Sequence, residues 1–532
     1  MQSANLRPES NAAKGMREAR HLGSALLITV VILLLSLTGL ICWYLIPGFS
    51  IHGGYEIEGN VIHVRRGGDL QAAIDRARPG DTIMLEAGAT FKGAFNLPKK
   101  SGQSFVTIRS SASDDQLTPE GHRIEPEKVS KLLPKILSNV KGVPAVLVTN
   151  GAHHYRLMAI EFGPTIEGLN NIIQIGTGEE LSVDELPFEI EFDRVFIHGD
   201  PSFGQRRGIA ANGRRITIKN SHISDIKMKG DESQAIAVWA SDGPVIITNN
   251  YLEAAAENIL FGGGSSRLKL VPTDCVVADN HLNKPLSWRN TDWVVKNLFE
   301  IKNGKRIKIV NNLMTHNWRM GQDGTAVLFT VRADNGNASV IEDIEFAGNI
   351  VRGAGGGLNI LGGEGGGGRD LTIRGNLFED INGSKWGSAG HFMKVSEWDG
   401  LVLENNTILQ TGNIANVYGR PSKRFIFRNN IVFENEYGIR GDNMGSGQEV
   451  VDLLLSRGVV SNNVIIGGPN ARYRMTNFFP PNAGEVGFVD ARSNFNLRPD
   501  SRYSKLGDSG SQIGAQLEYS TVGRTRISEP SK

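Results

Sequence analysis

The stretch from Asn297 to Arg332 alternates apolar and polar residues in short runs that end at Asn or Gly. Alternation with a period of two residues predicts β-strands, and Asn and Gly predict the turns between them. The pattern therefore predicts three short strands here, at residues 298–302, 306–310 and 326–332. Because the same pattern recurs along most of the chain, we interpret the protein as one coil stacked on copies of itself.

An Asn residue follows a strand at nearly regular intervals through the middle and C-terminal parts of the chain. These residues are Asn220, Asn250, Asn280, Asn312, Asn349, Asn376, Asn406, Asn430 and Asn463. Their spacing varies between 24 and 37 residues, so the strands recur while the loops differ in length, which is typical of a solenoid. Asn tolerates left-handed backbone dihedrals, and stacked copies can pass amide hydrogen bonds from coil to coil. We therefore assign these residues a structural role.

Residues 61–95 contain one amphipathic helix between two strands. Its apolar residues from Leu70 to Ala77 fall at helical spacing, Asp69 can cap the first turn, and Pro79 ends the helix. A single helix before an array of strands is what the first coil of a solenoid needs, because that coil would otherwise expose its core.

These residues resemble the N-terminal cap of right-handed parallel β-helix proteins of the pectin-lyase-like superfamily, and residues 486–515 resemble the C-terminal end of such proteins. The resemblance implies an all-β fold, a right-handed parallel β-helix with an N-terminal capping helix, over residues 61–515. Residues 516–532 would follow it as a polar tail. Residues 110–141 interrupt the repeat and are predicted to form an excursion from an early coil.

The N-terminal part of the chain predicts one transmembrane helix. Residues 22–55 contain no Lys, Arg, Asp or Glu, and the apolar segment at 24–48 is long enough to cross a bilayer, which takes about 20 residues. Basic residues precede this segment and none follows it before Arg65. The positive-inside rule therefore predicts a cytoplasmic tail at 1–23, a signal-anchor at 24–48, a linker at 49–60 and an extracytoplasmic β-helix. A cleaved signal peptide is the competing interpretation, although its apolar core is usually shorter.

The charge and cysteine content narrow the choice of partners. The formal net charge of the chain is +1, which does not favour binding to nucleic acid. The two cysteines, Cys42 and Cys275, imply no disulfide framework. We expect a monomer that contacts the membrane through its N-terminal helix.

One face of the coil is predicted to carry a stripe of polar and aromatic side chains. If apolar residues such as Phe299 and Ile301 fill the inward rows, strand alternation directs the residues between them outward. This outward set contains Trp239, Glu300, Lys302, Thr330, Arg332, Lys394, Asn416, Tyr418 and Arg440. It predicts a net basic stripe on an otherwise neutral protein. The competing interpretation is a solvated sheet face with ordinary ion pairs.

Three of these residues suggest a reaction. Neighbouring strands lie about 4.8 Å apart, so Glu300, Lys302 and Arg332 are expected to form one cluster. Cleavage of a uronate chain by β-elimination requires neutralisation of the carboxylate, removal of the C5 proton and protonation of the leaving oxygen. A metal ion or an Arg can perform the first task, and a Lys near a second positive charge can perform the next. Lys302 and Arg332 would supply those two cations.

The same stretch resembles the alginate lyase and chondroitinase B family, whose members are also right-handed β-helices. The resemblance implies that Lys302 is the catalytic base, Arg332 the catalytic acid and Glu300 a ligand of Ca²⁺. The spacing departs from the family pattern, in which the Lys stands several residues beyond a pair of acidic ligands. Here one residue separates Glu300 from Lys302, and the second acid is missing.

The insertion at residues 284–293 is rich in Trp and cations. Its Trp288 and Arg289 could stack on sugar rings and pair with carboxylates, or the loop could pack against the solenoid as a lid. With these two residues, the candidates for substrate binding are Trp239, Trp288, Arg289, Lys394, Tyr418 and Arg440.

The leading hypothesis is a membrane-anchored, extracytoplasmic, carbohydrate-active protein that acts on acidic polysaccharide as a lyase, by β-elimination. The alternative is a non-catalytic envelope or surface protein that binds glycan or a partner protein along the same face. The fold cannot choose between them, because it hosts lyases, hydrolases, isomerases and binding proteins.

Overall fold

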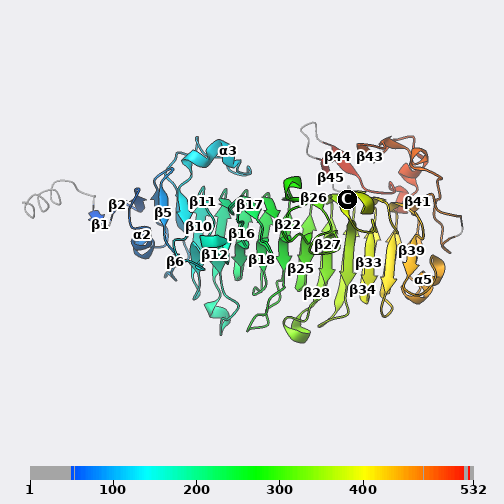
Figure 1. The fold of residues 1–532 in the computed structure, drawn as a ribbon, viewed down its shortest axis with the longest axis horizontal. Coiled ribbons are helices and arrows are strands. Elements are labelled where there is room, and N and C mark those ends of the chain that lie inside the picture. The colour runs from blue at the N-terminus through cyan, green and yellow to red at the C-terminus, as the bar shows by residue number, and fades with distance from the viewer. Residues whose placement is uncertain (1–49, 53, 471, 520–524, 528–532) are drawn as a thin grey trace, which may run out of the picture.

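The computed structural model describes residues 50–52, 54–470, 472–519 and 525–527, which form an elongated coil of short strands (Figure 1). Three long sheets of 16, 13 and 12 strands run along the coil. We call them sheet A, which ends at β40 (Val459–Ser461), sheet B, from β5 (Thr90–Lys92) to β41 (Val464–Ile466), and sheet C, from β6 (Phe95–Leu97) to β39 (Ile439–Gly441). Sheet A begins with three antiparallel strands, β1 (Ser50–His52), β2 (Tyr55–Glu58) and β3 (Val61–Val64). From β3 onward, the strands of the three sheets pair in parallel with the equivalent strands of the next coil. The predicted all-β architecture is confirmed.

Sheet C carries the predicted stripe. Between its first and last strands it contains β9 (Val146–Val148), β12 (Asn171–Ile175), β15 (Arg207–Ala211), β18 (Gln234–Val238), β21 (Glu257–Phe261), β24 (Asn297–Ile301), β27 (Thr325–Thr330), β30 (Gly356–Leu361), β33 (Met393–Ser396) and β36 (Ala415–Tyr418).

The stretch from 297 to 332 contains one strand more than its pattern predicts. Besides β24, β25 (Gly304–Val310) and β27, the chain forms β26 (Leu313–Asn317) in sheet B. Its residues LMTHN lack a clean apolar alternation, and the two that are fully buried are Met314 and the polar Asn317. Its pairing with the strands of neighbouring coils, rather than its own sequence, makes this segment a strand.

Alternation along β24 and β27 separates the core from the outer face as predicted. Phe299 and Ile301 pair in register with Val327 and Phe329, and all four side chains are fully buried in the core. Glu300 lies between the two inward residues and faces a cavity on the outside of sheet C.

The predicted asparagine ladder is present. One residue of each turn makes the amide hydrogen bonds between coils, and the residue before it adopts the left-handed backbone conformation. Asn312 Nδ2 donates to Asn349 Oδ1 over 3.0 Å, and the same bond recurs at every step from Asn250 to Asn463. The residue before each ladder position adopts the left-handed conformation, as Asn311 does with φ 57°. Asn220 occupies this left-handed position with φ 55°, so Ser221 rather than Asn220 precedes Asn250 in the ladder.

The predicted capping helix is α2 (Leu70–Arg76), which lies at one end of the coil (Figure 1). Asp69 caps it by accepting a hydrogen bond from the backbone N–H of Ala72 over 2.9 Å. Leu70 and Ile74 are buried against the first coils. The helix therefore closes the N-terminal end of the core.

Two segments of the chain cover the outside of the coil (Figure 1). The first is the excursion around α3 (Pro126–Val129), which contributes Leu117, Ile124 and Val129 to a small apolar cluster. The second follows β41, where the described chain adds no further long strand to the sheets and instead packs residues 486–517 against Ile350, Leu377 and other residues of sheet B. Within the predicted tail, β44 (Leu517–Tyr519) pairs with β45 (Thr525–Ile527).

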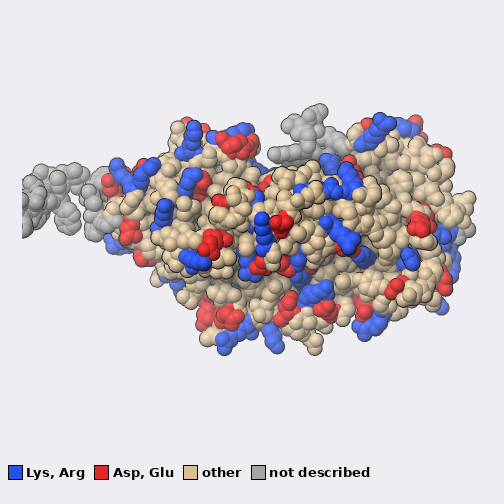
Figure 2. All heavy atoms as spheres, in the orientation of Figure 1, with Lys and Arg blue, Asp and Glu red and all other residues tan. Residues whose placement is uncertain are grey.

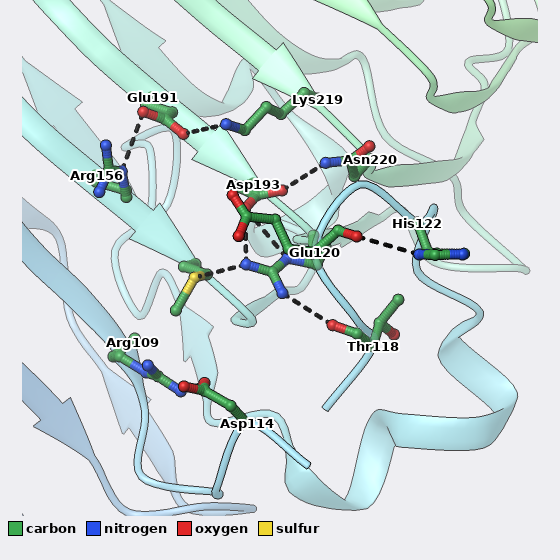
Figure 3. A network of polar contacts seen from close by, with 12 residues as sticks. Arg109, Asp114, Thr118, Glu120, His122, Arg156, Glu191, Asp193, Lys219 and Asn220 are labelled. Carbon is green, nitrogen blue, oxygen red and sulfur yellow. Dashed lines mark hydrogen bonds and ion pairs between the residues drawn. The ribbon is translucent and has the colours of Figure 1, made fainter. Parts of the chain in front are cut away.

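Polar contacts fasten the excursion to the coil (Figure 3). Arg194 donates to the carbonyl of Thr118 over 2.9 Å and pairs with Asp193 at 2.8 Å. Asp193 also accepts a hydrogen bond from Asn220 over 2.9 Å, and Arg109 pairs with Asp114. The excursion is therefore tied to a turn of the coil by charged hydrogen bonds as well as by apolar contacts.

No helix of the described residues is long and apolar enough to cross a membrane. The predicted transmembrane segment at 24–48 and the predicted cytoplasmic tail at 1–23 lie outside the described residues.

Candidate active site

A cavity of about 230 Å³ opens on the outer face of sheet C. The ends of β24 and β27 contribute Glu300, Lys302, Thr330 and Arg332 to its lining, the loop before β27 contributes Gln322 and Asp323, and β30 contributes Asn359. The predicted cluster of Glu300, Lys302 and Arg332 is therefore present. This volume is below the roughly 300–1,000 Å³ usual for small-molecule pockets, so the cavity can enclose only a short part of a polymer.

Glu300 lies at the base of this cavity with only 2% of its surface exposed. Its Oε1 accepts a hydrogen bond from Thr330 Oγ1 over 3.0 Å, and its Oε2 accepts one from Asn297 Nδ2 over 3.1 Å. Lys302 Nζ lies 4.0 Å from Oε1. A buried carboxylate needs such partners, because an unpaired one is costly. Glu300 is thus held rigidly beneath the lysine.

Arg332 also lines the cavity and pairs with a carboxylate that does not line it. Its Nη1 lies 2.6 Å from Oε1 of Glu364, in the loop that follows β30. Both side chains are partly exposed, at 41% and 49%, so the pair is weak enough to open for a ligand. The nearest carboxylate to Lys302 is Glu300, whereas the guanidinium of Arg332 is engaged by Glu364. The sequence suggested two free cations, but each of them has an acidic neighbour in the structure.

Acidic side chains offset most of the positive charge of the predicted basic stripe. Lys302 lies beside Glu300, Arg332 pairs with Glu364, and Lys394 pairs with Asp323. The loops that follow and precede the strands supply two of these acids, which strand alternation could not reveal. Figure 2 shows basic and acidic side chains interspersed over the face that it presents. The cavity is polar and nearly balanced in charge.

The predicted outward row is confirmed by the strand register. Glu300, Leu328, Asn359, Lys394, Asn416 and Arg440 follow one another in equivalent positions of consecutive strands. Arg440 is exposed at the far end of this row, with its guanidinium 5.0 Å from the ring of Tyr437. The cavity and Arg440 thus lie along one continuous face.

Two predicted aromatic residues flank the row. Tyr418 is half-buried, one strand beyond Ser396, and burial raises the pKa of its hydroxyl, an effect that Arg332 opposes. Trp239, also half-buried, has the guanidinium of Arg207 at 5.2 Å from its ring. The backbone after β21 crosses close to this ring, because a Cβ on Gly264 would lie 2.9 Å from Trp239 Cδ1. A glycine here lets the loop approach the indole.

The structure removes Trp288 from the substrate-binding surface. Only 5% of this residue is exposed, and it packs in a cluster with Trp293, Trp318 and Trp386. Arg289 stacks over the ring of Trp386 at 5.2 Å and donates to the carbonyl of Lys385. The loop therefore packs against the solenoid, as the competing interpretation has it.

The residues around Glu300 do not fit a calcium ion. Ca²⁺ takes about six to eight oxygen ligands, but both carboxylate oxygens of Glu300 already accept hydrogen bonds from Thr330 and Asn297. Across the described part of the chain, no three His, Cys, Asp or Glu side chains are placed to share a metal ion.

Several residues of the site were not predicted from the sequence. Asn297 and Glu257 are fully buried at the starts of adjacent strands, and Lys296 lies beside Glu257. Asp323 and Gln322 come from a loop. The sequence does contain one signal for Asn297 and Glu257. Each is the polar first residue of an otherwise apolar strand, and a buried polar residue needs a hydrogen-bond partner.

Comparison with known proteins supports the fold. No protein-family model and no curated protein matches the chain. Among solved structures, the PL6 family alginate lyase AlyGC is similar with a TM-score of 0.54 and 16% identity, over 87% of this chain and 57% of the lyase chain. The fold is a right-handed parallel β-helix.

Other β-helix enzymes are also similar. The GH136 lacto-N-biosidase from Eubacterium ramulus has a TM-score of 0.43 and 13% identity, over 80% of this chain and 68% of the biosidase. A mannuronic acid specific polysaccharide family 6 lyase from human gut microbiota has a TM-score of 0.41 and 12% identity, over 79% and 91% of the two chains. This β-helix chain spans 57% of the length of AlyGC, and at these identities the likeness concerns the fold.

Proposed function

We propose that this protein is a carbohydrate-active β-helix protein that binds an acidic polysaccharide along sheet C and cleaves it by β-elimination. The observation that carries the proposal is the cavity in which Lys302 and Arg332, from consecutive coils, flank the buried Glu300. The likeness in fold to an alginate lyase is consistent with it. The row that continues to Lys394 and Arg440 offers further cations for a chain of uronates.

The proposed reaction assigns a proton transfer to each of the two cations. Lys302 takes the C5 proton of a uronate, the C4–C5 double bond forms as the C4–O4 bond breaks, and Arg332 gives a proton to O4. Glu300 and Thr330 hold the floor of the cavity in place. The carboxylate of the substrate would replace Glu364 or Asp323 beside a cation, so binding exchanges one ion pair for another.

We also propose that the β-helix is displayed outside the cytoplasm on a single N-terminal membrane helix at 24–48. The apolar length of this segment and the basic residues that precede it support this proposal. An extracytoplasmic location would give the open face of sheet C access to polysaccharide.

The second candidate is a protein that binds acidic glycan without cleaving it. The ion pairs of Arg332 with Glu364 and of Lys394 with Asp323 favour this alternative, because cations already in use are suited to exchange a ligand and less suited to proton transfer. Both candidates use the same face.

The deciding experiment incubates the full-length chain with alginate, polygalacturonate and chondroitin and follows the absorbance of unsaturated uronate. We expect absorbance to rise with at least one of the three, and to be lost in Lys302→Met and in Arg332→Ala. Binding of a glycan without any rise in absorbance would favour the non-catalytic protein. Activity that survives both substitutions would leave the lyase but reject this site.

A further inference from the structure

The outer row of sheet C is covered on the side of the cavity that faces the start of the coil. In that direction the row continues through Leu260, Ala237 and Ala210. Ile259 and Phe261 belong to the core, so strand alternation turns Leu260 between them outward. Leu260, Ala237 and Ala210 are nevertheless only 3%, 1% and 0% exposed. Other parts of the chain must therefore lie over these three side chains.

A guanidinium and an indole meet across this part of the sheet. Arg207 is the first residue of β15, and Trp239 follows the last residue of β18. The guanidinium lies 5.2 Å from the indole ring, although the two residues come from opposite ends of neighbouring strands. Arg207 is held in this direction, because it donates to Gln234 Oε1 and to Asn171 Oδ1, both over 2.8 Å. The contact therefore crosses the outer face of β15 and β18, where the row contains only alanine.

A run of three glycines after β21 continues the cover toward the cavity. A Cβ on Gly264 would lie 2.9 Å from Trp239 Cδ1, and a Cβ on Gly263 would lie 3.0 Å from Leu260 Cδ2. The Cβ on Gly263 would also lie 3.5 Å from Lys302 Nζ. Because glycine has no side chain, the backbone can pass this close to its neighbours. The loop therefore runs between the indole and the proposed base and contacts both.

Together these groups form a bar across sheet C, which we define as Arg207, Trp239 and residues 262–264. The cavity lies on one side of the bar. Its lining comes from β24, β27, β30 and the loops beside them, and no described residue of an earlier strand contributes to it. On the far side of the cavity the outer row is open, because Asn416 is partly exposed and Arg440 is exposed. An extended ligand in the cavity can therefore continue toward β39 but not toward β15.

We infer that this site binds the end of a glycan chain, with the terminal uronate in the cavity and the rest of the chain along sheet C toward Arg440. The inference rests on the proposed function and deepens it by naming the part of the polymer that binds. The cavity of about 230 Å³ encloses only a short part of a polymer. Four strand spacings separate β27 from β39, about 19 Å in all, so further uronates can lie on the open part of the face beside Lys394 and Arg440.

Titration calorimetry can count chain ends. The full-length chain with Lys302→Met, which prevents cleavage, is titrated with a short and a long alginate fraction at equal uronate concentration. Polygalacturonate or chondroitin replaces alginate if that is the glycan bound. We expect the number of sites per uronate to fall in inverse proportion to the chain length. Binding within the chain would give the same number of sites per uronate on both fractions.

Removing the indole should open the bar. In Trp239→Ala, combined with Lys302→Met, the glycine loop loses the ring against which it packs, so a long alginate should bind at more sites per uronate. Phe188→Ala is the matched control, because Phe188 is also half-buried with a guanidinium, that of Arg215, 5.2 Å from its ring, but lies on sheet A. It should leave the number of sites unchanged. If Trp239→Ala does not fold, Trp239→Leu supplies the same comparison.

The results separate this inference from the proposed function. Equal numbers of sites per uronate on the short and long fractions would overturn the inference and leave the proposed function in place. A folded Trp239→Ala variant that still binds only chain ends would overturn it as well, because the bar is its basis. Absence of binding to alginate, polygalacturonate and chondroitin would reject both. If the wild type cleaves, long unsaturated fragments early in the reaction would contradict the inference, since cleavage at a chain end releases small products.

Discussion

Arg332, which lines the cavity, forms an ion pair with Glu364, with Nη1 of the arginine 2.6 Å from Oε1 of the glutamate. The two residues are 32 positions apart in the chain and follow the neighbouring strands β27 and β30. The guanidinium proposed to act on the substrate is therefore engaged before any substrate arrives. A ligand carboxylate must compete with Glu364 for it.

This competition can be measured. Glu364→Gln should release Arg332 and lower the Kd of an acidic oligosaccharide by about 2–5-fold, since exposed ion pairs contribute about 0–1 kcal/mol. Isothermal titration with alginate oligosaccharides would show the change. Glu345→Gln is the matched control, because it breaks a similar pair with Arg374 on sheet A. Equal effects of the two substitutions would indicate a general change in net charge.

Removing the proposed base should separate cleavage from binding. Lys302→Met should lower kcat by about 100-fold or more, the lower end of what a positioned acid or base contributes, with little change in the Kd of the oligosaccharide. Absorbance of unsaturated uronate and titration calorimetry measure the two quantities. Lys305→Met serves as the control, because Lys305 pairs with Glu342 on sheet A. Retention of full activity by Lys302→Met would reject the assigned role.

The asparagine ladder should be important for stability. Asn312→Ala removes the side-chain donor to Val277 O and leaves Asn349 Oδ1 with only the backbone N–H of residue 312. It also leaves the N–H and the Nδ2 of Asn280 without their shared acceptor. Because each lost partner of a buried group costs about 1–3 kcal/mol, we expect a loss of about 3–5 kcal/mol in the free energy of unfolding. Urea denaturation would measure it.

The residue beside this asparagine supplies the control. Asn311 adopts a left-handed conformation that glycine accepts readily, so Asn311→Gly should change the stability by less than about 1 kcal/mol. If both substitutions had the same small effect, the ladder would not be a source of stability.

The fold should lose stability in mild acid through His222. Burial, together with the charge of Arg123, lowers the pKa of this histidine to about 4. Between about pH 6.5 and pH 4 the unfolded chain binds a proton that the folded chain does not, so the stability is full above this window and falls as the pH is lowered through it. The loss has an upper bound of about 3 kcal/mol.

Denaturation midpoints between pH 7 and pH 4 would test this prediction. His222→Gln should weaken the dependence on pH, whereas His122→Gln should not, because His122 lies exposed on the excursion. The same slope in all three proteins would assign the acid sensitivity to other groups.

The repeat made the outer row of sheet C predictable. Alternation places Glu300 between two apolar residues, and equivalent positions of later coils then give Lys394, Asn416 and Arg440, all confirmed by the register. The asparagine ladder could also be predicted, because the asparagines recur after the strands of successive coils. It did not separate the ladder residue from the left-handed residue before it, because both are often Asn.

The acids that balance the cations could not be predicted in this way. Asp323 and Glu364 lie in loops, where no periodicity sets the direction of a side chain. Lys296 hydrogen-bonds Glu232, which lies 64 residues earlier in the chain. The course of the loop that leads to Lys296 depends on the packing of Trp288 and its neighbours. That packing also explains why Trp288, which looked suited to a sugar ring, is buried instead.

The stacking of the coils also sets a distance. From β6, the first strand of sheet C, to β24 there are six strand spacings, about 29 Å at 4.8 Å each. Every junction of the asparagine ladder offers the same donors and acceptors, so a whole coil could be added or removed there without leaving an unmatched group. With the membrane anchor that we propose, the number of coils before β24 would set the distance between the cavity and the bilayer.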